Sequence, residues 1–188
     1  MNEELQKLYE AARRAKEHDD RKAAVWYYDR ILTRDPLSWE AHFYTAYFRV
    51  RRDSIEAVIH SVEAIKGRLS STLYLIKNHV GEEAERLQAT REVGVCCARA
   101  AVLLFRTAAE NFPEEVNRYR AYLMGDLLYN LRYEIWHTFN GSSLYETILN
   151  DYKTSAEISA GFRFFGIEID YAMVKLPPQM LFYDLDRG

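Results

Sequence analysis

Pro36 constrains the fold of this chain more than any other single residue, because it interrupts an aromatic-rich stretch that otherwise favours a helix. The stretch, residues 23–48, reads AAVWYYDRILTRDPLSWEAHFYTAYF. Pro36 disfavours helical geometry in Asp35, so one helix must end there. Ser38 then stands where an N-cap belongs, and a second helix is expected to run from it to about Arg52. The stretch is therefore a boundary between two helices.

Helical signals recur along the rest of the chain. With eight Gly and four Pro among its 188 residues, the sequence suits long helices better than a strand-and-turn fold. Asp53 and Glu56, for example, have the spacing of a capping box. Residues 69–80 either continue the helix that starts there or form a short one of their own. Caps and apolar periodicity together predict helices over residues 2–18, 20–34, 38–52, 53–67, 82–111, 113–139 and 143–159.

The last part of the chain, residues 161–188, has no clear period. Its IEIDY run alternates like a strand, yet the sequence offers no other convincing strand to pair with it. We expect a helix, or an extended tail packed on the helices, that ends at Pro177-Pro178. The sequence as a whole therefore predicts an all-α fold.

Charge and hydropathy exclude several classes of partner. The net charge of −3 argues against a nucleic-acid partner, which usually needs a basic face. The RVRR run at 49–52 is short and is interpreted as a solvated helix end. The longest apolar patch, residues 93–105, contains Arg99 and is shorter than the roughly 20 residues that a membrane-spanning helix needs. Residues 1–20 lack the pattern of a secretory signal. We expect a soluble, cytoplasmic protein.

A spacing typical of paired helices repeats near the N-terminus. The first copy places small and large residues at Leu8, Ala11, Ala12, Ala15, Ala24 and Tyr28, and closes with Pro36. A step of 34 residues carries Leu8 to His42 and Ala12 to Ala46. The second copy continues with Ala57, one residue early, and has Ser61 where an aromatic residue belongs. Residues 5–66 therefore resemble the tetratricopeptide repeat family, with one good copy and one degraded copy.

The resemblance implies antiparallel helix pairs that stack side by side, with small residues where two helices approach closely. Residues 68–188 show no comparable copy. We expect them to form a helical extension or bundle of longer helices that packs on the helix pairs of residues 1–67, as one continuous domain.

In this family the first helix of each repeat lines a concave groove that receives peptides. The positions carried over to this chain are Tyr9, Arg13, Lys16, Phe43, Tyr44, Tyr47 and Arg51. The Lys and Asn with which some members clamp a terminal carboxylate are absent, because Tyr9 and Arg13 stand at those positions. The three cations still allow an acidic ligand. The alternative is that Phe43, Tyr44 and Tyr47 pack against later helices instead of lining a groove.

No catalytic or metal-binding pattern stands out. Glu134 and His137 have the i, i+3 spacing of a di-iron bundle, but such a site needs two of these motifs and two further Glu. The sequence has no G-x-S-x-G elbow, its five His are scattered, and no Gly-rich phosphate loop occurs. Cys96 and Cys97 are adjacent, and we expect them to be buried thiols. We therefore expect no cofactor, no metal and no catalysis.

The expected function is a protein- or peptide-binding interaction module, or scaffold, that uses a helical groove. The alternative is a helical bundle with an internal small-molecule or metal pocket, possibly an enzyme. That alternative depends on the small-residue helix at 93–101 facing Tyr119, Tyr122, Tyr129 and Tyr133. A homodimer is also left open, since a short repeat stack often needs a partner for its uncovered face.

Overall fold

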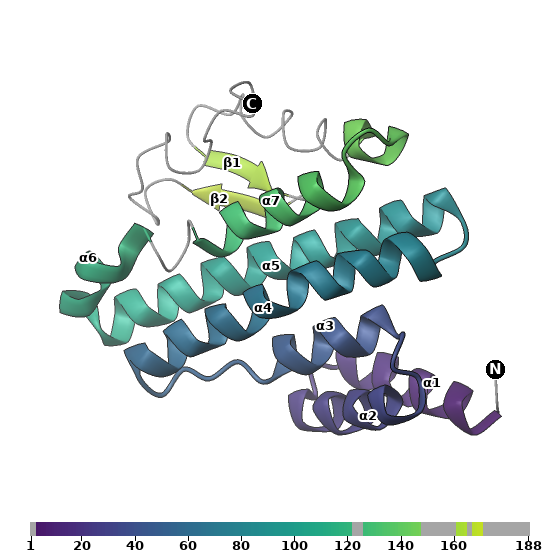
Figure 1. The fold of residues 1–188 in the computed structure, drawn as a ribbon. Coiled ribbons are helices and arrows are strands. Elements are labelled where there is room, and N and C mark those ends of the chain that lie inside the picture. The colour runs from purple at the N-terminus through teal and green to yellow at the C-terminus, as the bar shows by residue number, and fades with distance from the viewer. Residues whose placement is uncertain (1–2, 122–125, 148–160, 165–166, 171–188) are drawn as a thin grey trace.

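The computed structural model describes residues 3–121, 126–147, 161–164 and 167–170 (Figure 1). These residues form helices, apart from one short hairpin, so the predicted all-α class is confirmed. The helices are α1 (Glu3–Glu17), α2 (Arg21–Arg34), α3 (Trp39–Phe48), α4 (Ile55–His79), α5 (Glu83–Asn111), α6 (Pro113–Ala121) and α7 (Leu127–Phe139). A further helical turn begins at Ser143. The rest of the helix predicted to 159, and Pro177-Pro178, lie outside the described residues.

Local caps place the first helices where the sequence predicts them. Asp20 caps α2 by accepting a hydrogen bond from the Ala23 backbone N–H (3.1 Å). The helix ends at Arg34, directly before the Asp35-Pro36 pair. Ser38 caps α3 by accepting from the Ala41 N–H (3.2 Å). Such caps satisfy backbone donors that the first helical turn leaves without a partner.

The α3 helix is shorter than predicted and ends at Phe48, not near Arg52. Arg21 of α2 donates hydrogen bonds to the carbonyl oxygens of Phe48 (3.2 Å) and Val50 (2.9 Å). Those carbonyls would otherwise accept bonds from the next helical turn. A side chain from a neighbouring helix thus stabilises the end of α3.

The start of α4 also differs by one residue from the prediction. Ser54, and not Asp53, is the N-cap, and its hydroxyl oxygen accepts from the Ala57 N–H (3.1 Å). Asp53 instead pairs with Arg51 (2.6 Å). The helix then continues to His79, so residues 69–80 belong to it rather than to a separate helix. The division predicted after residue 67 therefore falls inside one helix.

The helices are arranged in layers around a shared core. Figure 1 shows α1, α2 and α3 grouped on one side of α4 and α5, with α7 on the other side. One hydrophobic cluster includes buried residues from α1 to α7, so the N-terminal helices and the extension share a core. Small residues let α5 pack closely, and both of its cysteines are buried free thiols, as expected. The largest fully buried side chains of the shared core include Tyr28, Phe43, Tyr44, Ile65, Leu69 and Leu104.

A small hairpin corrects the prediction for the C-terminal part. Strand β1 (Gly161–Phe164) pairs in antiparallel fashion with β2 (Ile167–Asp170), and Phe162 lies opposite Ile169. The partner that the sequence seemed to lack is the GFRF segment directly before IEID. Four residues are too few to display a convincing period of their own, and this is why the pairing was missed.

Candidate functional site

The groove positions predicted on α1 are already engaged with partners in the same chain. The Tyr9 hydroxyl donates to Asp35 Oδ2 (2.7 Å). Arg13 makes a two-point contact with Glu40, through Nε (3.2 Å) and Nη2 (2.5 Å). Lys16 forms an ion pair of 2.5 Å with a carboxylate of α5. All three side chains therefore have partners within the chain, and neither cation is unpaired.

The aromatic groove positions on α3 belong to the core. Phe43 is fully buried, and Tyr44 is 1% exposed and stacks on Tyr28 with a ring-centroid distance of 5.2 Å. The Tyr44 hydroxyl donates to Glu92 and lies 3.8 Å from the Cys96 sulfur, both on α5. Burial raises the pKa of Tyr44 far above its usual range. Because α5 covers this face, Phe43 and Tyr44 do not line an open groove.

The remaining two predicted groove residues, Arg51 and Tyr47, differ in their exposure and surroundings. Arg51 lies in the exposed link between α3 and α4 and pairs with Asp53 at 2.6 Å. Tyr47 is partly buried and lines a pocket beside α5. Burial raises the pKa of its phenol to about 12, while the positive charge of Arg99 opposes that rise. Tyr47 is thus the one aromatic residue from the predicted α3 set that borders an open site.

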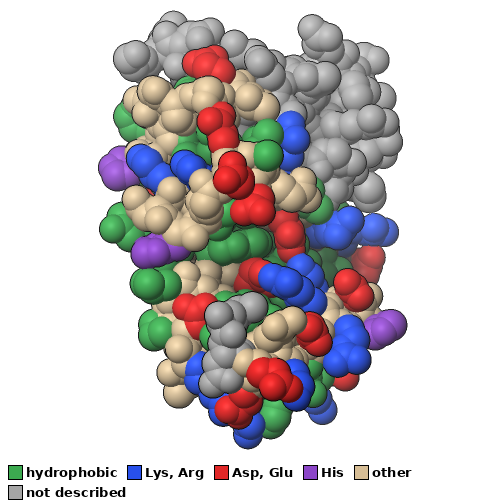
Figure 2. Space-filling model, turned by 90° about the vertical axis from the view of Figure 1, so that its right-hand side faces the viewer, with side chains coloured by type: hydrophobic (Ala, Val, Ile, Leu, Met, Phe, Trp, Pro, Cys, Tyr) green, Lys and Arg blue, Asp and Glu red, His purple; other side chains and the backbone are tan. Residues whose placement is uncertain are grey.

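Two hollows remain open along α5, and the first is acidic. We call it the acidic cleft; it has a volume of about 680 Å³ and lies between α1, the α2–α3 turn and the α4–α5 turn. Figure 2 views this end of the molecule and shows acidic and basic side chains side by side there. Its lining includes Tyr9, Arg13, Asp35, Glu40, His79, Glu85, Gln88 and Glu92. Its one arginine is held by Glu40, so the cleft presents mainly negative charge.

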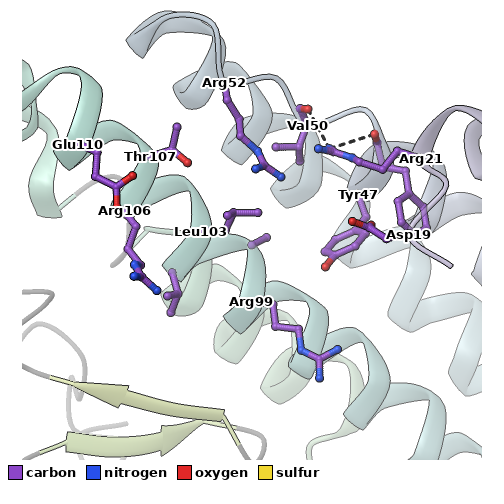
Figure 3. A pocket seen from close by; sticks show the side chains of 13 residues that line it. Asp19, Arg21, Tyr47, Val50, Arg52, Arg99, Leu103, Arg106, Thr107 and Glu110 are labelled. Carbon is purple, nitrogen blue, oxygen red and sulfur yellow. Dashed lines mark hydrogen bonds between the residues drawn. The ribbon is translucent and has the colours of Figure 1, made fainter. Parts of the chain in front are cut away.

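The second hollow is rich in arginine. This arginine pocket has a volume of about 560 Å³ and lies between the α3–α4 link and the second half of α5 (Figure 3). Figure 3 shows Arg52 extending from the link toward Leu103, while Arg99 and Arg106 project from α5 on either side of Leu103, with their guanidinium groups pointing away from Arg52 in this view. The pocket is lined by Asp19, Arg21, Tyr47, Phe48, Val50, Arg52, Arg99, Ala100, Val102, Leu103, Arg106, Thr107 and Glu110.

The four arginines of this pocket have different tasks. Arg21 is committed to the two carbonyl oxygens at the end of α3. Burial lowers its pKa, and the positive charge of Arg52 lowers it further. Arg52, Arg99 and Arg106 are exposed, and within the described residues none of the three has an acidic partner within 4 Å. The pocket therefore holds three guanidinium groups that are available to an anion.

Sequence reasoning missed these three arginines for identifiable reasons. Arg52 was interpreted as part of a solvated helix end, and Arg99 only as a polar interruption of an apolar patch. For the two arginines on α5, the usable signal was spacing. Arg99, Leu103 and Arg106 stand at i, i+4 and i+7, which places the three residues on one helix face. That face remains exposed within a helix otherwise rich in buried small residues.

Of the four tyrosines in the alternative internal pocket, the structure describes the side chains of only two. Tyr129 and Tyr133 are both exposed on α7, and the side chains of Tyr119 and Tyr122 lie outside the described set. His137 is exposed as well and stacks on the Tyr133 ring at 6.1 Å. In the part of the chain that the structure describes, no three His, Cys, Asp or Glu side chains form a group suited to a metal ion.

Comparisons with protein-family models, with curated proteins and with solved structures give no match for this chain. The site must therefore be interpreted from its own chemistry. Among the described ranges, no helix combines the length and the apolarity that crossing a membrane requires.

Proposed function

We propose that this chain is a protein- or peptide-binding module whose binding site is the arginine pocket. The observation that carries the proposal is the set of three available guanidinium groups around an exposed apolar side chain, Leu103, which is 39% exposed. Arginine, together with Trp and Tyr, is among the residues that contribute most to binding energy at protein interfaces, and Tyr47 also lines this pocket. The proposal keeps the tetratricopeptide-like pairing of α1 to α4 as its scaffold and moves the binding site away from the family's groove.

Two features support the pocket over the predicted groove. The cations of the groove are paired with Glu40, Glu92 and Asp53, so they would have to lose one partner to gain another. Two of the three aromatic residues of the groove, Phe43 and Tyr44, are buried, and Tyr44 donates to Glu92 of α5. Neither restriction applies to Arg52, Arg99 and Arg106 or to Leu103, which are exposed in the arginine pocket.

A photo-crosslinking experiment in cells of the native source tests this proposal. Leu103 is replaced by p-benzoylphenylalanine in the full chain, and the same probe replaces Tyr74, an exposed aromatic residue (60%) of α4 outside the pocket. We expect a discrete protein adduct from position 103 that is absent from position 74 and is lost when Arg99 and Arg106 are both changed to Gln. The same adducts from both positions, or none from position 103, would contradict the proposal.

A further inference from the structure

We propose that the occupant of the arginine pocket is an acidic segment of a partner protein, in which two carboxylates about 10 Å apart flank an apolar side chain. This inference rests on the proposed function and names the chemistry that the same site recognises.

The charge of the pocket selects an anion. Arg52, Arg99 and Arg106 have no acidic partner within 4 Å among the described residues, so an incoming carboxylate displaces no existing ion pair. All three are arginines and not lysines. A guanidinium presents a planar pair of donors that matches the two oxygens of a carboxylate, and such two-point contacts are among the stronger hydrogen bonds in proteins.

The geometry of α5 sets the spacing. Arg99 and Arg106 are seven residues apart on one helix, which corresponds to about 10 Å along its axis. A peptide in the polyproline II conformation has three residues per turn and advances about 3.1 Å per residue, so two acidic residues three positions apart point the same way and lie about 9 Å apart. Leu103 lies between the two arginines (Figure 3). An apolar residue between the two acids would contact it and the aliphatic stems of the arginines.

Acidic residues at the two ends of the pocket limit the length of the acidic segment. Asp19 lies at one end, beside Tyr47, and Glu110 lies at the other (Figure 3). A long uniform polyanion such as a nucleic acid would meet both carboxylates, and repulsion between like charges would weaken its binding. A short acidic segment avoids both ends. The pocket therefore favours an acidic peptide over a nucleic acid.

Direct binding of defined peptides tests the inference on the full-length chain. The probe is the fluorescent, end-blocked peptide GSELSEGS, and its matched control is the amide peptide GSQLSQGS. We expect the acidic peptide to bind at least about tenfold more tightly, which corresponds to one charge-assisted hydrogen bond. Its affinity should fall as salt is raised, because these charges are exposed. It should also fall about tenfold when Arg99 and Arg106 are both changed to Gln.

The control variant is Arg51→Gln, which removes an exposed arginine that lies outside the pocket and pairs with Asp53. It should leave peptide affinity unchanged, and circular dichroism should show that all variants keep their helices. Loss of binding in Arg51→Gln equal to that in the double variant would overturn the assignment, because any surface arginine would then suffice.

Failure of this inference can be separated from failure of the proposed function. Equal binding of the two peptides, or binding of neither, overturns the acidic occupant. If position 103 still gives its adduct in the crosslinking experiment, the binding module stands with a different partner chemistry. Tighter binding of a single-stranded oligothymidylate than of GSELSEGS also overturns the inference, because the pocket would then prefer a nucleic-acid backbone. Absence of both peptide binding and the adduct removes the two proposals together.

Discussion

The two hollows along α5 differ in how their charges are used. In the acidic cleft, Arg13 is held by Glu40, and the neighbouring Lys16 is held by Glu92. In the arginine pocket, Arg52, Arg99 and Arg106 contact no acidic side chain within 4 Å, as far as the structure describes the chain. Charges of the first kind hold segments of the chain together. Charges of the second kind have no such task in the described part of the chain, and our proposal assigns them to a ligand.

The charged contacts between α5 and the N-terminal helices show how paired charges hold segments of the chain together. Glu92 accepts hydrogen bonds from Lys16 of α1 and from Tyr44 of α3, so one carboxylate connects three helices. Together with the burial of Phe43 and Tyr44, this contact holds α5 over the face where the family resemblance predicts a peptide groove. Among the described residues, Phe43 and Tyr44 of the predicted groove are buried, and two open hollows lie along α5.

The largest expected effect tests whether the face under α5 is core. Phe43→Ala should lower the free energy of unfolding by about 3–5 kcal/mol, because the side chain is fully buried and its removal leaves a cavity. Leu103→Ala, the matched control in the arginine pocket, should cost less than about 1 kcal/mol because that side chain is already partly exposed. Urea denaturation measures both values. A small effect of Phe43→Ala would instead identify an accessible groove residue.

Alkaline pH should lower the stability of the fold by ionising two tyrosines, the buried Tyr44 in the core and the partly buried Tyr47 beside the arginine pocket. Burial raises the pKa of Tyr47 from 10.0 to about 12, and the positive charge of Arg99 opposes this rise. Burial raises the pKa of Tyr44 further, and the negative charge of Glu92 adds to that rise. The folded chain therefore keeps both phenols protonated at a pH where the unfolded chain ionises them. The stability they contribute is complete below pH 10 and is lost as pH rises toward and beyond about 12.

Each such tyrosine should contribute a slope of about 1.4 kcal/mol per pH unit in this window. The measurement is urea denaturation at several pH values, with ultraviolet absorbance of phenolate as the direct readout. Tyr47→Phe should show a shallower loss of stability between pH 10 and about 12 than the wild type. Identical slopes for the two proteins would mean that Tyr47 ionises freely and does not form a buried wall of the pocket.

Local signals accounted for most helix boundaries. Pro36 and Ser38 placed the end of α2 and the start of α3, and Pro113 placed the start of α6. The error at the end of α3 came from a contact between distant residues. The end of α3 depends on Arg21, which lies 27 positions before Phe48, and no local pattern encodes that hydrogen bond.

The candidate site was less predictable than the fold, for a related reason. The sequence identified the correct residue types for a groove but could not show that Tyr44 would donate to Glu92, 48 positions away. Whether an arginine is held or available depends on acidic partners that only the folded chain brings close. Arg51 and Arg52 illustrate this point, because the first pairs with Asp53 while the second extends into the pocket.

Removal of the Glu92 carboxylate, which links α5 to α1 and α3, should lower the free energy of unfolding by an intermediate amount. Glu92→Ala leaves the buried hydroxyl of Tyr44 and the ammonium of Lys16 without their acceptor. The expected loss is about 1–2 kcal/mol, a value reduced because Glu92 is 30% exposed. Glu110→Ala at the end of the arginine pocket is the control and should change stability by less than about 0.5 kcal/mol. Equal losses in the two variants would contradict the distinction between the two hollows.

The smallest expected effect concerns the arginines themselves. Changing Arg99 and Arg106 together to Gln should alter the free energy of unfolding by no more than about 0.5 kcal/mol, because neither guanidinium holds an acidic partner within the described residues. Arg13→Gln in the acidic cleft should cost up to about 1 kcal/mol, because it breaks the two-point contact with Glu40. Thermal and urea denaturation of the two variants, side by side, give the comparison. If the double variant loses more stability than Arg13→Gln, the pocket arginines support the fold, and their availability to a ligand no longer follows from their lack of partners.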